Sequence, residues 1–143
     1  MTLDDLGRRK VAVWGMGSEG LAMARLLIER GSPPVLIDDQ VESAAARVEA
    51  DLPVALPVLP PDRVEWGGLE VVVRSPGVSR YRDELAAAES AGVTVTTATA
   101  VWLEDFHPAP LLAITGTKGK STTAALAAAI LEHQGLSVAL VGN

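Results

Sequence analysis

The stretch Lys10-Val11-Ala12-Val13-Trp14-Gly15-Met16-Gly17-Ser18-Glu19-Gly20 decides the fold. Its first half is an apolar run with the length of a buried strand, and its second half is a G-x-G-x-x-G bend that opens a helix ending near residue 30. A second apolar run, Val35-Leu36-Ile37, ends in Asp38, about 20 residues after the glycines, as a dinucleotide-binding unit has it. This order of elements predicts an α/β, Rossmann-like domain with a parallel sheet.

The glycine bend has two interpretations. Free backbone N–H groups at the start of the helix could hold the phosphates of a nucleotide, and Asp38 could bind the nucleoside. Alternatively, Gly15, Gly17 and Gly20 only allow tight packing of helix on strand, and Asp38 is a solvated turn residue. The pattern alone leaves both interpretations open.

The rest of the first domain continues the alternation of strands and helices. We expect a helix over residues 43–50, at most one short strand over 54–56, a strand over 69–74, a helix over 83–91, a strand over 93–95, and a helix over 99–106 capped by Thr99. The strand over 69–74 ends in Ser75-Pro76-Gly77, which is either a rigid turn or a second wall of the crevice at the carboxyl ends of the strands. Arg80 and Arg82 follow as a diphosphate clamp or a solvated face.

A second glycine loop lies near the end of the chain. Thr115-Gly116-Thr117-Lys118-Gly119-Lys120-Ser121-Thr122 stands between an expected strand over 111–115 and an expected helix over 120–134, and a further strand is expected over 138–141. Glycine amides, a helix dipole and a lysine suit a phosphate group, and a Ser or Thr hydroxyl suits Mg²⁺. The Walker spacing is absent, because Ile114 stands five residues before Gly119.

Two prolines in His107-Pro108-Ala109-Pro110 predict a domain boundary. We therefore expect a Rossmann-like domain over residues 1–106, a linker over 107–110, and the start of a P-loop domain over 111–143. The last segment is too short to bury a core of its own. We expect it to be the first βαβ unit of a longer, truncated domain.

Composition excludes several classes of function. The chain has 143 residues, no cysteine and a net charge of −6, with an isoelectric point near 4.8. Thiolate metal sites are thus excluded, and a broad nucleic-acid surface, which needs a basic face, is not expected. Magnesium held by oxygen ligands remains open. No apolar run approaches the roughly 18 residues of a spanning helix, so we expect a cytoplasmic protein.

Together the two loops resemble the Mur ligase family, ATP-dependent enzymes that join amino acids to a UDP-linked muramoyl precursor of bacterial peptidoglycan. Residues 115–122 are similar to the family's T-G-T-x-G-K-[ST]-[ST] loop. The glycine bend, Asp38 and the Ser75-Pro76-Gly77 turn look most like the family's D-glutamate-adding members. The resemblance runs from about residue 10 to the last residue, and corresponds to about the first third of such an enzyme.

The resemblance implies a role for each loop. The UDP-substrate-binding residues would be Met16, Gly17, Ser18, Glu19, Asp38, Ser75, Pro76, Gly77 and Asn143. The ATP-binding residues would be Gly116, Thr117, Lys118, Gly119, Lys120, Ser121 and Thr122, with Lys120 as the catalytic residue and Ser121 on Mg²⁺. Two positions depart from the family: Glu19 places an acid near a diphosphate, and Gln40 stands where some relatives have arginine.

The implied reaction transfers a phosphoryl group from ATP to the carboxylate of UDP-N-acetylmuramoyl-L-alanine, and the amine of D-glutamate then attacks the acyl phosphate. This places the chain in peptidoglycan synthesis, and so in cell wall biogenesis, cell division and cell shape. Because the residues for adenine and glutamate would lie outside this sequence, we expect the chain alone to be inactive. Alternatives are another Mur-type ligase, alanine-adding or similar to folylpolyglutamate synthase, or a non-catalytic NAD-binding Rossmann module.

Overall fold

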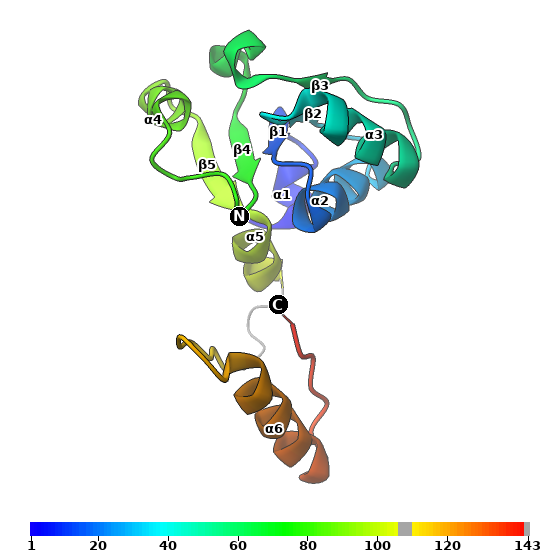
Figure 1. Ribbon diagram of the computed structural model, residues 1–143, viewed down its shortest axis with the longest axis vertical. Coiled ribbons are helices and arrows are strands. Elements are labelled where there is room, and N and C mark those ends of the chain that lie inside the picture. Colours follow the sequence, from blue (N-terminus) through cyan, green and yellow to red (C-terminus); the bar gives the residue numbers. More distant parts are fainter. Residues whose placement is uncertain (106–109, 142–143) are drawn as a thin grey trace. The chain divides into compact units, whose positions relative to one another are not determined.

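The computed structural model describes residues 1–105 and 110–141. Contacts between residues divide the chain into two compact units, Met1–His107 and Pro108–Asn143. In the described residues, the first unit carries the sheet and the second carries one long helix (Figure 1). Within the two described ranges, no helix combines the length and the apolar character needed to cross a lipid bilayer.

The first unit is built on a parallel sheet with the strand order β3-β2-β1-β4-β5. The strands are β1 (Val11–Trp14), β2 (Val35–Ile37), β3 (Val58–Leu59), β4 (Val71–Arg74) and β5 (Thr94–Thr97). In the register of the sheet, Ala12 lies opposite Val35 on one side and Val72 on the other. The strand order reverses at β1, which makes the carboxyl end of β1 a topological switch point. The predicted Rossmann-like α/β fold is therefore confirmed.

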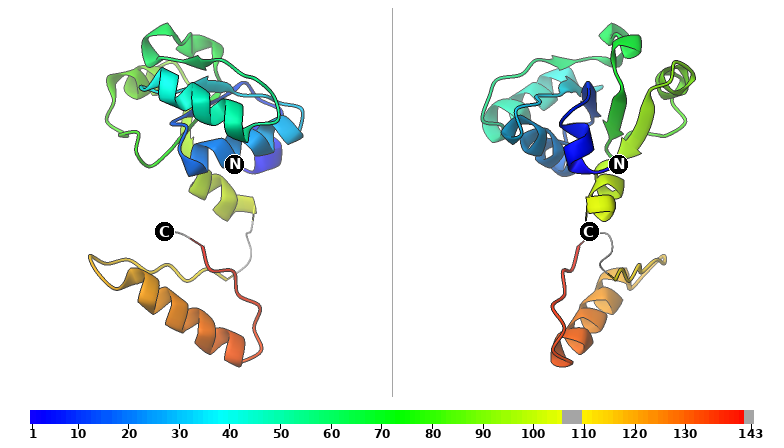
Figure 2. Two further views of the ribbon diagram at one scale, coloured as in Figure 1. Left: turned by 45° about the vertical axis from the view of Figure 1, so that its right-hand side comes forward. Right: turned by 180° about the vertical axis from the view of Figure 1, so that it is seen from behind.

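Helices cover both faces of this sheet. The helices are α1 (Leu3–Leu6), α2 (Ser18–Glu29), α3 (Val41–Asp51), α4 (Asp83–Ser90) and α5 (Ala98–Asp105), with short 3-10 turns at Pro61–Arg63 and Trp66–Gly68. Side chains of α1, α2, α3 and α5 share one apolar cluster, and side chains of α4 share the other. In Figure 2, α2 and α3 lie on one side of the sheet and α4 lies on the other.

Strand β1 is buried on both faces, which explains its continuous apolar sequence. Val11 and Val13 pack in the cluster of α2, while Ala12 and Trp14 pack in the cluster of α4. Full burial of one such Val side chain contributes roughly 1.5–3 kcal/mol. The apolar core therefore fixes where β1 ends, and with it the position of the glycine bend.

Several elements differ from the sequence predictions. The expected strand over 54–56 is wrong: β3 forms at Val58–Leu59, because Val58 is 7% exposed and packs in the core whereas Val54 is 43% exposed. Helix α5 begins at Ala98, and the hydroxyl of Thr97, rather than Thr99, accepts a hydrogen bond from the N–H of Ala100 at 3.2 Å. Helix α1, closed at its start by a Thr2–Asp5 capping box, was not predicted.

The second unit contains helix α6 (Lys120–His133), close to the predicted span. The strands expected over 111–115 and 138–141 are wrong, since residues 110–119 and 136–141 belong to no strand. The described part of this unit offers them no neighbouring strand. Leu111, Leu112, Leu140 and Val141 are 57–64% exposed, so these segments have neither ladder partners nor a core to pack against.

Candidate functional site

Three loops leave the sheet at the carboxyl ends of β1, β2 and β4. Asp38, directly after β2, joins two of them: its Oδ2 accepts a hydrogen bond from the N–H of Met16 at 2.7 Å, and its Oδ1 accepts one from the N–H of Gln40 at 2.9 Å. Asp38 is half-buried. The acid that ends β2 therefore holds the glycine bend in place, and is not a solvated turn residue.

The glycines of the bend have different roles. A Cβ on Gly20 would lie 1.9 Å from the carbonyl oxygen of Gly15, and Gly15 itself has a φ of +97° and packs on Ser75. Both positions thus need glycine for packing and backbone conformation. Gly17 has no heavy atom within 4 Å of such a Cβ and is exposed. The packing interpretation thus holds for Gly15 and Gly20, while Gly17 leaves room for a ligand to approach the backbone.

At the start of α2, some residues are exposed to solvent and others are buried or already hydrogen-bonded. Gly17 is its N-cap and makes no side-chain cap, and Ser18 is exposed. The N–H of Met16 already donates to Asp38, and the Met16 side chain is fully buried. The Oε2 of Glu19 is buried and makes no hydrogen bond within the described residues. The first turn of this 12-residue helix has no side-chain cap, so its N–H groups and the helix dipole favour an anion. The carboxylate of Glu19 in the same turn would repel one.

The turn after β4 packs directly on the glycine bend. Ser75 donates its hydroxyl to the carbonyl of Gly15 at 2.7 Å and its N–H to the carbonyl of Trp14 at 2.8 Å. Pro76 and Gly77 are exposed. The structure thus brings the turn after β4 against the glycine bend through Ser75.

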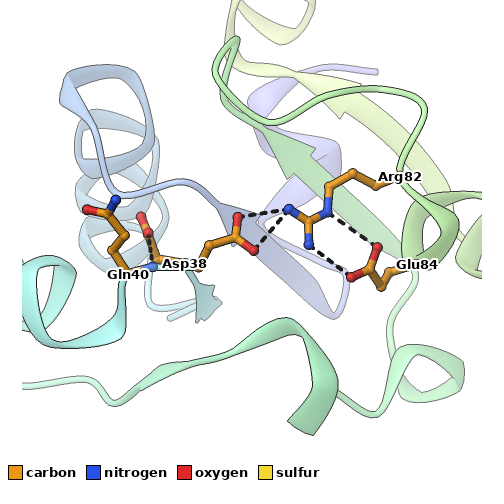
Figure 3. A network of polar contacts seen from close by, with 5 residues as sticks. Asp38, Gln40, Arg82 and Glu84 are labelled. Atoms are coloured by element: carbon orange, nitrogen blue, oxygen red, sulfur yellow. Dashed lines mark hydrogen bonds and ion pairs between the residues drawn. The ribbon is translucent and has the colours of Figure 1, made fainter.

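Arg82 connects the loop after β4 with the loop after β2 (Figure 3). Its Nη1 lies 2.9 Å from Oδ1 of Asp39, and its Nη2 lies 2.9 Å from Oε1 of Glu84. The guanidinium also lies over the ring of Trp14, 4.6 Å from the ring centre. Hydrogen bonds from Arg82 are the main cause that lowers the pKa of Glu84, and the same contact raises the pKa of Arg82.

Arg80 differs from Arg82, although the two are only two residues apart. Within the described residues Arg80 makes no hydrogen bond or ion pair. It borders a cavity of about 240 Å³ at the carboxyl ends of β4 and β5; the cavity is lined by Arg74, Arg80, Glu89, Val95, Thr96, Thr97 and Ala100. Of the two arginines considered for a diphosphate clamp, Arg82 is already committed to carboxylates.

The second glycine loop is exposed along its whole length. All seven residues considered for ATP are exposed: Gly116, Thr117, Lys118, Gly119, Lys120, Ser121 and Thr122. Gly119 is the N-cap of α6 with a left-handed φ of +75°, which glycine adopts without strain. Nζ of Lys120 donates to the carbonyl of Gly116 at 2.8 Å. The lysine side chain thus folds back onto its own loop.

Comparison with known proteins identifies the family of this chain. The family "Mur ligase MurD-like, N-terminal domain" matches residues 9–97, a range that contains all five strands of the described sheet. The chain belongs to the MurD-like Mur ligases. The resemblance expected from the two loops is therefore confirmed.

Curated relatives of this MurD-like chain carry two kinds of name. "UDP-N-acetylmuramoyl-L-alanine--L-glutamate ligase" from Micromonospora sp. is 39% identical over 92% of this chain and 29% of its own length. The protein of that name from Xanthomonas axonopodis pv. citri is 38% identical over 100% and 32%. "UDP-N-acetylmuramoylalanine--D-glutamate ligase" from Jannaschia sp. is 38% identical over 94% and 31%. The chain thus spans about a third of the length of these relatives.

Among solved structures, quinate dehydrogenase from Corynebacterium glutamicum in complex with NAD resembles the MurD-like chain with a TM-score of 0.44 and 15% identity. The likeness covers 72% of this chain and 52% of that one.

Sequence reasoning about the MurD-like site missed the link between Asp39 and Arg82. The two residues are 43 positions apart, and no local pattern joins them. The sequence does contain one signal for this link: an acid directly after Asp38 and an arginine after the Ser-Pro-Gly turn, both expected at the same edge of the sheet. Asn143, predicted near the muramoyl group, and His107 of the predicted linker lie outside the described residues.

Proposed function

We propose that the first unit binds UDP-N-acetylmuramoyl-L-alanine at the carboxyl ends of β1, β2 and β4. One observation carries this proposal: in a MurD-like chain, two hydrogen bonds, from the N–H of Met16 to Asp38 and from the hydroxyl of Ser75 to Gly15, gather the three loops around the switch point at β1. Ligands of open α/β sheets bind at such a point. The UDP moiety would lie along Gly17, Ser18 and Glu19, with the uracil toward Asp38 and the sugar toward residues 75–77.

Asp38 would contact uracil while it holds the glycine bend. Each carboxylate oxygen has two lone pairs, and the structure uses one on each for the N–H groups of Met16 and Gln40. A uracil N–H could therefore be accepted without displacing either bond. Met16 would support the site through its backbone position, since its own N–H is taken.

For the second unit we propose that residues 116–122 hold the phosphates of ATP. The N–H groups at the start of α6 and the freedom of Gly119 suit a phosphate, and Lys120 would exchange the carbonyl of Gly116 for the β- and γ-phosphates. The exposed hydroxyl of Ser121 would be a ligand of Mg²⁺, which neutralises phosphate charge when bound.

The activity proposed for the whole protein is amide-bond formation in peptidoglycan precursor synthesis, in the cytoplasm. The substrate carboxylate would take the γ-phosphoryl group of ATP, releasing ADP, and the amine of glutamate would then displace phosphate from the acyl phosphate and lose a proton. Lys120 would stabilise charge on the transferring phosphoryl group. The residues that select glutamate would lie outside this chain, which alone would not turn over.

The sequence resemblance favours D-glutamate as the incoming amino acid, whereas relatives named for L-glutamate and for D-glutamate match at 39%, 38% and 38% identity. Likeness over this stretch therefore does not separate the enantiomers. Phosphate release by the full-length protein, measured with ATP, UDP-N-acetylmuramoyl-L-alanine and each enantiomer in turn, would assign one. Release with D-glutamate alone is the outcome that fits the sequence prediction.

Calorimetric titration of the chain tests the substrate proposal against an NAD-binding module. We expect heat with UDP-N-acetylmuramoyl-L-alanine and none with NADH. A matched pair of variants, Lys120→Met and Lys118→Met, tests the ATP loop. The first should weaken binding of ATP with Mg²⁺ far more than the second, because of the two lysines only Lys120 reaches back to Gly116. Heat with NADH alone, or equal effects of the two lysine variants, would contradict the respective proposals.

A further inference from the structure

The three loops of the first unit are tied to one another in a closed ring. Ser75 ties the loop after β4 to the glycine bend, at 2.7 Å from the carbonyl of Gly15. Met16 ties the glycine bend to the loop after β2, at 2.7 Å from Asp38. Arg82 closes the ring by joining the loop after β4 to Asp39, the neighbour of Asp38, at 2.9 Å. These ties surround the carboxyl end of β1, where Trp14 lies.

The tie through Arg82 differs from the other two in its geometry. Its guanidinium is held by carboxylates on both sides: Nη1 donates to Asp39, and Nε and Nη2 donate to the two oxygens of Glu84 at 3.3 and 2.9 Å. The ring of Trp14 supports one of its faces. Arg82 is 29% exposed and Asp39 is 49% exposed. Ion pairs at such exposure add little stability, but a forked, stacked guanidinium fixes position.

We propose that Arg82 is a positioning residue for the uridine nucleotide. It holds residues 75–82 at a fixed distance from Asp38 and Asp39, so that the two walls of the crevice are already spaced for the ligand before it binds. This inference rests on the proposed function of the first unit, because the nucleotide is the ligand that the spacing serves. It assigns Arg82 a role distinct from that of Arg80, which has no such partner within the described residues.

Binding of UDP-N-acetylmuramoyl-L-alanine to five variants of the chain tests the role. R82A should weaken binding on the order of tenfold, the size of one coupling within a contacting network. R82K should bind as weakly as R82A, since a lysine ammonium lacks the planar, forked donors with which the guanidinium spans Asp39 and Glu84. D39N should weaken binding less than R82A, and the double variant D39N/R82A should bind no more weakly than R82A. R47A, a change of an exposed arginine on α3, should bind as the unaltered chain does.

A measurement without ligand separates failure of this inference from failure of the proposed function. Amide hydrogen exchange of Met16, whose N–H donates to Asp38, should be several-fold faster in R82A than in R47A, while the global unfolding midpoint changes little. If the unaltered chain binds no UDP-substrate, the proposed function fails. The exchange result still shows whether Arg82 holds the three loops together. Unchanged Met16 exchange, or full recovery of affinity in R82K, would overturn the positioning role.

Discussion

The two glycine loops of this chain both lead into a helix, and they have different surroundings. The first, residues 15–20, leaves a strand that is paired on both sides, and Asp38 and Ser75 bind its backbone. The second, residues 116–122, leaves a segment outside any strand, and all of its residues are exposed. Within the described residues, its one side-chain hydrogen bond is internal, from Nζ of Lys120 to the carbonyl of Gly116. The first glycine loop is therefore held by contacts from the sheet and its neighbouring loops, which the second lacks within the described residues.

This contrast predicts that equal substitutions will have unequal consequences in the two loops. In the first, a new methyl group meets backbone that the sheet holds in place. In the second, it meets solvent, and the cost is confined to the local backbone conformation. Four experiments test that contrast, in order of decreasing expected change in stability. They are substitutions at Gly20, Gly119 and Ser75, and a pH titration that involves Glu84.

Gly20→Ala should have the largest effect. Its Cβ would lie 1.9 Å from the carbonyl oxygen of Gly15, so α2 must move away from β1 at a cost of about 3 kcal/mol, the upper range for overpacking. Gly17→Ala is the matched control, because its Cβ meets nothing within 4 Å and the loss of an N-cap glycine costs below about 1 kcal/mol. Denaturant unfolding of both variants checks this, and equal midpoints would contradict the packing role.

Gly119→Ala should cost about 1 kcal/mol, the penalty for a left-handed alanine at φ +75°. Because no other atom lies within 4 Å of that Cβ, the loss should stay within the start of α6. Hydrogen exchange in the first turn of α6 should become roughly fivefold faster, with the unfolding midpoint of the first unit unchanged. A shifted midpoint would show that the two loops are energetically coupled.

Much of the first unit could be predicted because its signals are local. Both ends of the strand over residues 35–37 were predicted correctly, since glycine and prolines stand before it and two acids follow it. Asp38 and Ser75 were expected at one crevice because parallel strands end at one edge of a sheet. The strand at Val58–Leu59 was misplaced because prolines at positions 53 and 57 obscure the pattern, and burial against the core decides between neighbouring apolar runs.

Other features depend on partners that a local pattern does not contain. Residues 111–115 and 138–141 have the composition of strands, but a strand also needs a neighbour to pair with. The bridge from Arg82 to Asp39 arises only when β2 and β4 flank β1 in the sheet. The sequence treats Gly15, Gly17 and Gly20 alike, and only the packed structure separates the role of Gly17 from that of the other two.

Ser75→Ala should destabilise the first unit by about 1 kcal/mol, the usual net value of one hydrogen bond. The variant removes the donor to the carbonyl of Gly15 and leaves the backbone bond from Ser75 to Trp14 in place. Ser43→Ala, on the exposed face of α3, is the control. Denaturant midpoints check the difference between them. A larger loss for the control would mean that the turn after β4 does not stabilise the glycine bend.

The pH dependence of stability should show the smallest effect, through Glu84. Its pKa is lowered in the folded chain, first by the hydrogen bonds from Arg82 and then by its own backbone N–H. A carboxyl with a lowered folded pKa adds stability above its unfolded pKa, about 4.3, and loses it as pH falls through the folded value. Arg82 stays protonated throughout, because its pKa is raised.

Denaturant midpoints measured from pH 7 down to pH 3 for the unaltered chain and for Glu84→Gln isolate this contribution. Asp5, whose pKa is also lowered, mainly by its hydrogen bond with Thr2, titrates in both proteins and cancels in the difference. The unaltered chain should be the more stable at neutral pH, and the difference should shrink below about pH 4.3. A difference that stays constant with pH would mean that Glu84 contributes through packing, and Arg82 would then be held by Asp39 and Trp14 alone.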